Sequence, residues 1–151
     1  MRRKLALCGG LAMAALLPLL PAGCCCTGVG KVREAAERQK TQNDLKQIAL
    51  AYINYCDANP NKGPAKADDL RQYLGGNAEL LQAMTSGKYT VIWNVTIADV
   101  ARNQGGTSGT VLAYESTAPT TGGAVAMADG SVRQMTAPEF NAAKKAQPKK
   151  Q

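Results

Sequence analysis

The chain has 151 residues, a net charge of +7 and no histidine, and its length allows one domain of ordinary size. Residues 31–143 carry eleven Lys/Arg and eleven Asp/Glu, so the excess charge lies at the two ends of the chain. A duplex-binding protein needs a basic face on its folded domain, and this class is therefore excluded. The absence of histidine excludes Ser-His-Asp and Cys-His catalytic arrangements and the usual zinc sites. We expect no enzymatic activity, no cofactor, no metal and no nucleic-acid partner.

The first 26 residues have the pattern of an export signal. Residues 2–4 are basic, residues 5–20 are apolar, and a Pro-Ala-Gly run precedes Cys24. This order resembles the lipobox of bacterial lipoproteins, in which the cysteine is acylated, although a lipobox favours Leu where this chain has Pro21. The resemblance implies lipidation at Cys24 and attachment to a membrane of the cell envelope, with the rest of the chain on the periplasmic side.

Two other readings of the same segment remain open. It could stay uncleaved as a signal anchor, or it could be an ordinary cleaved signal. The apolar run of about 16 residues is short of the ~20 that span a bilayer, which counts against the anchor.

Residues 31–57 contain no Pro and no Gly, and their composition predicts one long helix. The first half, up to Asp44, is polar on every side, which is typical of a solvated stalk. The second half has an apolar stripe at helical spacing, which predicts packing on a globular head. Asn59-Pro60 ends the helix. The stripe consists of Leu45, Ile48, Ala49, Tyr52, Ile53 and Cys56.

Short helices and strands are predicted after this helix. Asp68 or Asp69 can cap a helix that ends at Leu74, Asn77 can cap a second one, and residues 96–102 suit either a strand or a helical turn. Asp129-Gly130 between two apolar runs predicts a hairpin, and Thr136 with Glu139 forms a capping box for a closing helix. The predicted strands are residues 88–95, 110–114, 124–128 and 131–135.

The predicted fold is α+β, with a long N-terminal helix on a small antiparallel sheet and a short C-terminal helix. The basic residues at the C-terminus suggest a disordered tail. The predicted division is a signal at 1–26, a linker and stalk at 27–44, a head at 45–141 and a tail at 142–151.

Six segments carry a family resemblance: residues 33–36, 42–48, 52–55, 112–115, 126–132 and 136–140. On these segments the chain resembles the pilin-like proteins, which include type IV pilins and type II secretion pseudopilins. The resemblance implies a pilin-like head and protein partners in a secretion or pilus-like system. The chain departs from prepilins because its apolar segment precedes Gly23-Cys24, and the fifth residue after Gly23 is Gly28 instead of Glu.

Two functions remain open. The first is a non-enzymatic, membrane-tethered envelope protein that acts as a structural or interaction component, and a free sheet edge would favour it. The second is a periplasmic ligand-binding lipoprotein that uses loops 103–109 and 117–123 as pocket walls. Seven residues are candidate sites, and a structural role is favoured for each. They are Tyr52, Tyr55, Cys56, Asp68, Asp69, Glu115 and Asp129. Glu115 and Asp129 could meet as paired carboxylates or a calcium site, but no Asp-rich run accompanies them, so this is the disfavoured alternative.

Overall fold

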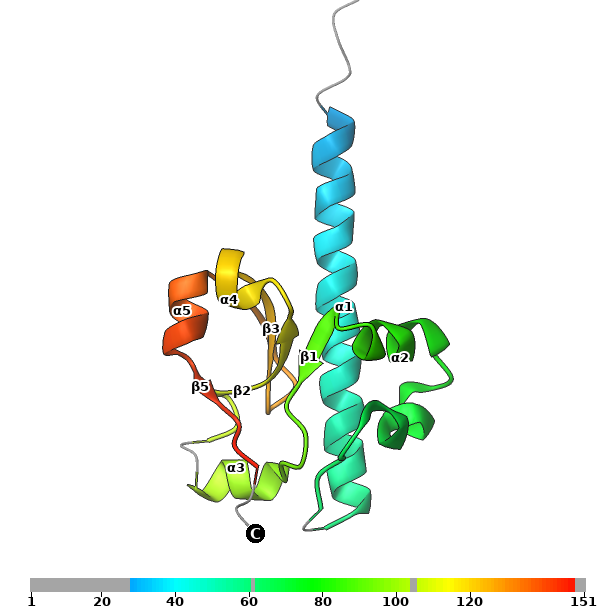
Figure 1. Ribbon diagram of the computed structural model, residues 1–151, viewed down its shortest axis with the longest axis vertical. Coiled ribbons are helices and arrows are strands. Elements are labelled where there is room, and N and C mark those ends of the chain that lie inside the picture. The colour runs from blue at the N-terminus through cyan, green and yellow to red at the C-terminus, as the bar shows by residue number, and fades with distance from the viewer. Residues whose placement is uncertain (1–27, 61, 104–105, 149–151) are drawn as a thin grey trace, which may run out of the picture.

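The computed structural model describes residues 28–60, 62–103 and 106–148. The long helix α1 (Gly28–Ala58) is the spine of the molecule, and its N-terminal end rises clear of the other elements (Figure 1). Residues 30–40 are all exposed, whereas from Thr41 onward one side of the helix is buried, with Leu45 and Ile48 fully so. The predicted change from a polar stalk to a packed half is therefore confirmed.

The sheet has four antiparallel strands in the order β1-β2-β3-β4. A two-residue strand, β5, pairs in parallel with the N-terminal end of β2, while β1 pairs with the C-terminal part of the same strand. A long helix packed on an antiparallel sheet confirms the predicted α+β class. The strands are β1 (Tyr89–Val91), β2 (Thr110–Glu115), β3 (Gly123–Met127), β4 (Val132–Met135) and β5 (Lys144–Lys145).

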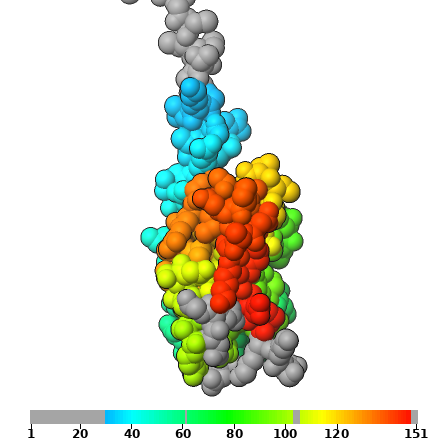
Figure 2. Space-filling view, turned by 90° about the vertical axis from the view of Figure 1, so that its left-hand side faces the viewer, coloured from blue at the N-terminus to red at the C-terminus, as the bar shows by residue number. Residues whose placement is uncertain are grey.

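Both faces of the sheet are covered (Figure 1). On one face lies α1, and η1 packs on the side of α1 away from the sheet, while α2 is in contact with both η1 and β1. The other face carries α4 and α5, and Figure 2 shows α5 and β5 at the surface there. The short helices are η1 (Ala67–Leu74), α2 (Ala78–Thr85), α3 (Ile97–Asn103), α4 (Ala118–Thr121) and α5 (Ala137–Ala142).

The two faces have separate cores, because alternate residues of each strand point to opposite sides. The larger core joins α1 to the sheet and includes Tyr52, Leu112 and Ala126. The smaller core lies under α5 and consists of Val111, Ala118, Val125, Met127 and Phe140. This second layer explains why every residue of β3 is buried.

Two of the predicted helix starts and the hairpin are confirmed. The Asn77 side chain accepts a hydrogen bond from Leu80 N at 3.0 Å, and Glu139 accepts one from Thr136 N at 2.8 Å. In the hairpin, Gly130 N donates to Met127 O at 3.0 Å, and Gly130 has the left-handed φ of 83° that closes a turn followed by a bulge.

The predicted cap of the first short helix is wrong in position. Helix η1 begins at Ala67, so Asp68 and Asp69 lie inside its first turn. The Asp69 carboxylate instead reaches back and accepts hydrogen bonds from the backbone N–H groups of Ala65 and Lys66, at 2.8 and 3.2 Å. It still supplies acceptors to the helix start, but from the third helical position.

The strand predicted at 88–95 is too long, because β1 ends at Val91. Asn94 has a left-handed φ of 61°, which turns the chain away from the sheet. The Trp93 ring then stacks on Tyr52 at 6.5 Å between centroids. The ambiguous segment that follows is helical, as α3.

The predicted disordered tail from residue 142 is wrong for its first part. Residues 144–145 pair with β2, and Ala146 N donates to Val111 O at 2.9 Å. The Lys145 ammonium lies 4.5 Å from the centre of the Phe140 ring and also donates to Phe140 O at 3.1 Å. Backbone pairing with Thr110 and Val111 of β2 and the contact of Lys145 with the Phe140 ring fix residues 144–145 on the sheet, so the folded head extends beyond residue 141.

Candidate functional site

Strand β4 is the last strand of the sheet, and its outer edge is unpaired. Met127 N donates to Ser131 O at 2.8 Å, and antiparallel pairing alternates from that bond. The N–H and C=O groups of Val132 and Gln134 therefore point away from β3. Among the described residues none of these four groups has a hydrogen-bond partner. The strand offers a short template for another strand.

The distal end of this edge, away from the stalk, lies against an apolar part of α1. Gly130 of the hairpin turn lies against Leu50 and Ile53 of α1. A Cβ atom added at Gly130 would be 3.5 Å from Ile53 Cδ1 and 3.6 Å from Leu50 Cδ2. Leu50 is 46% exposed, and it interrupts an otherwise polar outer face of α1. Val132 is partly buried and packs against the larger core. A partner at this end would meet apolar surface.

The proximal end, towards the stalk, is hollow and polar. Two open cavities of about 420 and 460 Å³ lie between α1 and the sheet, and both are lined by Arg38, Glu115 and Gln134. Arg38 pairs with Glu34 at 2.6 Å, and Glu115 Oε2 accepts from Ala124 N at 3.4 Å. We call the whole strip the β4 edge surface. It comprises Arg38, Leu50, Ile53, Val132 and Gln134.

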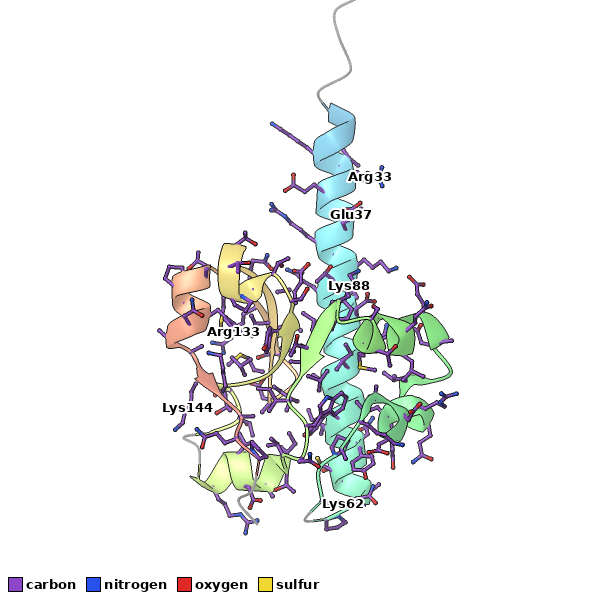
Figure 3. All side chains as sticks on the ribbon, viewed as in Figure 1. Arg33, Glu37, Lys62, Lys88, Arg133 and Lys144 are labelled. Atoms are coloured by element: carbon purple, nitrogen blue, oxygen red, sulfur yellow. The ribbon has the colours of Figure 1, made fainter. Side chains whose placement is uncertain are left out.

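Arg133 lies on the opposite face of the same strand. It pairs in register with Val125 of the smaller core, so its side chain is on the α5 side of the sheet (Figure 3). The side chain is exposed and takes part in none of the ion pairs formed among the described residues. The free edge therefore carries a positive charge that forms no ion pair among the described residues. Hydrogen bonding from Ser131 lowers the pKa of the Asp129 carboxyl, and Arg133 is near enough to help lower it further.

The tyrosines and the cysteine of α1 have structural roles. Tyr52 is fully buried, and its hydroxyl donates to Val95 O at 2.9 Å and accepts from Val95 N at 3.1 Å. Burial raises the pKa of this hydroxyl, which keeps it neutral. Tyr55 packs edge-to-face on Tyr73. Burial also raises the pKa of the Cys56 thiol, which is the opposite of what a nucleophilic cysteine requires.

The carboxylates do not gather into a site. Glu115 contacts the start of β3, whereas Asp129 lies beyond its end, so the two are separated by the length of the strand. Asp68 pairs with Arg71 at 3.0 Å. Within the described part of the chain, no group of three or more His, Cys, Asp or Glu side chains could hold a metal ion. The Glu115/Asp129 calcium hypothesis is therefore wrong.

The two loops considered as pocket walls are also far apart. Residues 106–109 precede β2 and residues 117–123 follow it, so the six residues of the strand separate them. Part of the second loop is helix α4, and only its end, Thr121 to Gly123, lines one of the polar cavities. The described residues of the two loops therefore do not enclose a common pocket.

The signal segment, Cys24 and the neighbouring Cys25 and Cys26 lie outside the described residues. Among those that are described, no helix is both long and apolar enough to span a bilayer. Comparison of the chain with protein-family models, with curated proteins and with solved structures gives no match in any of the three.

Sequence reasoning did not identify the β4 edge surface. One signal was present, because Leu50 is a large apolar residue on the polar side of the predicted helix, between Gln47 and Asn54. The rest of the surface depends on which strand is last in the sheet, and strand order is not encoded in local patterns.

Proposed function

We propose that this chain is a non-enzymatic, membrane-tethered envelope protein whose pilin-like head binds a protein partner in a secretion or pilus-like assembly. The single observation that carries the proposal is the unpaired β4 edge beside an exposed apolar residue of α1. Main-chain groups at a free edge supply affinity for an added strand, and nearby side chains supply selectivity.

The arrangement of elements supports the same proposal. A long helix whose distal half covers one face of an antiparallel sheet is the layout that the resemblance to pilins and pseudopilins implies. The exposed half, residues 30–40, provides a spacer of roughly 16 Å at 1.5 Å per residue. A lipid on Cys24 would hold the spacer at the membrane and leave the head free to meet a partner.

Photo-crosslinking in intact membranes tests the proposal. A photo-reactive residue at Gln134 should yield a discrete crosslinked protein band, because Gln134 lies on the free edge. The matched control is Gln72, an exposed glutamine of η1 on the other side of α1. Equal crosslinking from the two positions, or none from Gln134, would contradict the proposal.

The anchor is tested separately. Cys24→Ala should release the protein from the membrane fraction, and mass analysis of the wild-type N-terminus should show acyl chains on Cys24. Several acyl chains hold a protein firmly, at ~0.8 kcal/mol per buried CH₂. A wild type without acylation and a variant that remains equally membrane-bound would exclude the lipoprotein assignment.

A further inference from the structure

The β4 edge surface has two chemically different sides, and this difference restricts what can bind. On the α1 side an added strand would face the apolar Leu50, Ile53 and Val132 at the distal end, and Gln134 and Arg38 at the polar proximal end. On the α5 side it would face Arg133, which is exposed and has no ion-pair partner among the described residues. Successive side chains of a strand point to opposite sides.

We propose that the partner segment is an extended peptide with an acidic residue next to an apolar one, which adds to β4 as the next strand of the sheet. This inference rests on the proposed function, that the head binds a protein partner. The apolar residue packs on the α1 side beside Leu50 and Val132, the acidic residue next to it pairs with Arg133, and the residue after that lies over Gln134. The outward N–H and C=O groups of Val132 and Gln134 supply the main-chain hydrogen bonds.

The alternation of sides gives the edge its selectivity. Isolated charges on an edge strand discourage indiscriminate pairing, and Arg133 has this effect for apolar or basic strands. For a strand that places a carboxylate opposite it, the same charge becomes attractive. Because β4 has only four residues, an added strand can form few main-chain hydrogen bonds with it, which suits a transient interaction.

A second copy of this chain fits the edge less well. When Val132 of one copy pairs with Gln134 of the other, the two Arg133 side chains lie directly opposite each other. Like charges in that position destabilise a strand pair. The surface is therefore suited to a different, acidic segment.

Peptide binding to the full-length protein in detergent micelles tests the proposal. The probes are two fluorescent peptides, Thr-Val-Glu-Val-Thr and Thr-Val-Lys-Val-Thr, each flanked by Gly-Ser and followed by fluorescence anisotropy. We expect the glutamate peptide to bind the wild type at least ~10-fold more tightly than the lysine peptide. Equal affinities, or no binding of either peptide, would overturn the inference.

Three variants identify the site. Arg133→Glu should reverse the preference between the two peptides, and Gln134→Pro should abolish binding of both, because it removes an outward N–H from an edge position that tolerates proline. The control is Lys62→Glu, an exposed charge reversal beyond the end of α1 (Figure 3), which should change neither affinity. An Arg133→Glu variant that keeps the wild-type preference would show that the charge does not select the partner.

Two further results separate this inference from the proposed function. A crosslink from Gln134 that survives Arg133→Glu unchanged would leave the proposed function intact but overturn the acidic partner. A crosslink whose mass equals two copies of this chain would show that the edge pairs with itself, and would also overturn it.

Discussion

Residues 30–40 and residues 41–58 belong to one continuous helix, yet they have opposite surroundings. The first part is exposed on every side and is laced by ion pairs one turn apart, Arg33–Glu37 at 3.0 Å and Glu34–Arg38 at 2.6 Å. The second part buries a wide stripe between the sheet and η1. Exposed pairs of this kind contribute a few tenths of a kcal/mol each, whereas a buried Leu contributes about 1.5–3 kcal/mol.

This difference shows that the packed half stabilises the whole helix. A free helix of about 12 residues is marginal in water, so the stalk depends on continuing a helix that is already formed. Substitutions in the stalk should therefore lower the free energy of unfolding less than substitutions in the packed half. Four predictions test this contrast, from the largest expected effect to the smallest.

Leu45→Ala should lower the free energy of unfolding by about 2–5 kcal/mol, because it removes a fully buried side chain and leaves a cavity. Val32→Ala, at a stalk residue that is 70% exposed, should change it by less than about 0.5 kcal/mol. Urea unfolding followed by circular dichroism measures both. Similar losses in the two variants would remove the contrast between the halves.

Tyr52→Phe should cost about 1–3 kcal/mol, because the backbone N–H and C=O of Val95 then lose their buried partner. Tyr73→Phe is the matched control, since the Tyr73 hydroxyl has no hydrogen bond to any described residue and its ring is retained. The same unfolding assay applies. A Tyr52→Phe variant as stable as the control would mean that the hydroxyl is not needed to hold residues 92–95.

Lys40 joins the end of the stalk to α2 through an ion pair with Glu79. A hydrogen bond from Lys40 lowers the pKa of Glu79 below its ordinary value of 4.5. A lowered folded-state pKa gives stability that is present above the unfolded pKa and is lost as the pH falls through the folded pKa. Lys40→Met should return the Glu79 pKa towards 4.5 and flatten the loss of stability in acid. An NMR titration of the Glu79 carboxyl carbon, from about pH 2.5 to 6, measures the shift.

If the Glu79 titration is identical in the wild type and in Lys40→Met, the two residues do not interact in solution. Lys31→Met removes a stalk cation nine positions further from the head; it is the control and should leave the Glu79 titration unchanged.

Glu37→Gln should have the smallest effect, below about 0.5 kcal/mol, because both members of its pair with Arg33 are well exposed and screened by salt. The measurement is again urea unfolding, at low and at high salt. A loss above 1 kcal/mol would show that the stalk is held by its charges and not by the packed half.

Local signals predicted the elements whose causes are local. The long helix is found within three residues of its predicted start, since its composition and the Asn59-Pro60 stop depend on neighbours in the chain. The hairpin at Asp129-Gly130 and the capping box of Thr136 with Glu139 also involve residues a few positions apart. Errors arose where a distant residue takes part, as when the Tyr52 hydroxyl binds Val95 and the strand before it ends early.

The candidate site shows the same limit. Glu115 at a predicted strand end and Asp129 in a predicted turn could be paired on sequence alone, but residues at opposite ends of β3 cannot meet. Leu50 was visible as an apolar residue on a polar helix face, yet nothing near it in the chain indicated that Gly130 and Val132 lie beside it. Their proximity depends on how the sheet packs against α1, which brings together residues that are distant in the sequence.

The sequence by itself determined an α+β chain with a polar stalk, a packed helical half and an Asp-Gly hairpin, because helix composition, apolar periodicity and turn chemistry act over a few residues. Only the tertiary structure decided that β4 is the unpaired edge, that Arg133 stands on one side of it and Leu50 near the other, and that Lys144–Lys145 pair with β2. Strand order and pairing join residues that are distant in the chain, and they follow from burying both faces of the sheet at once.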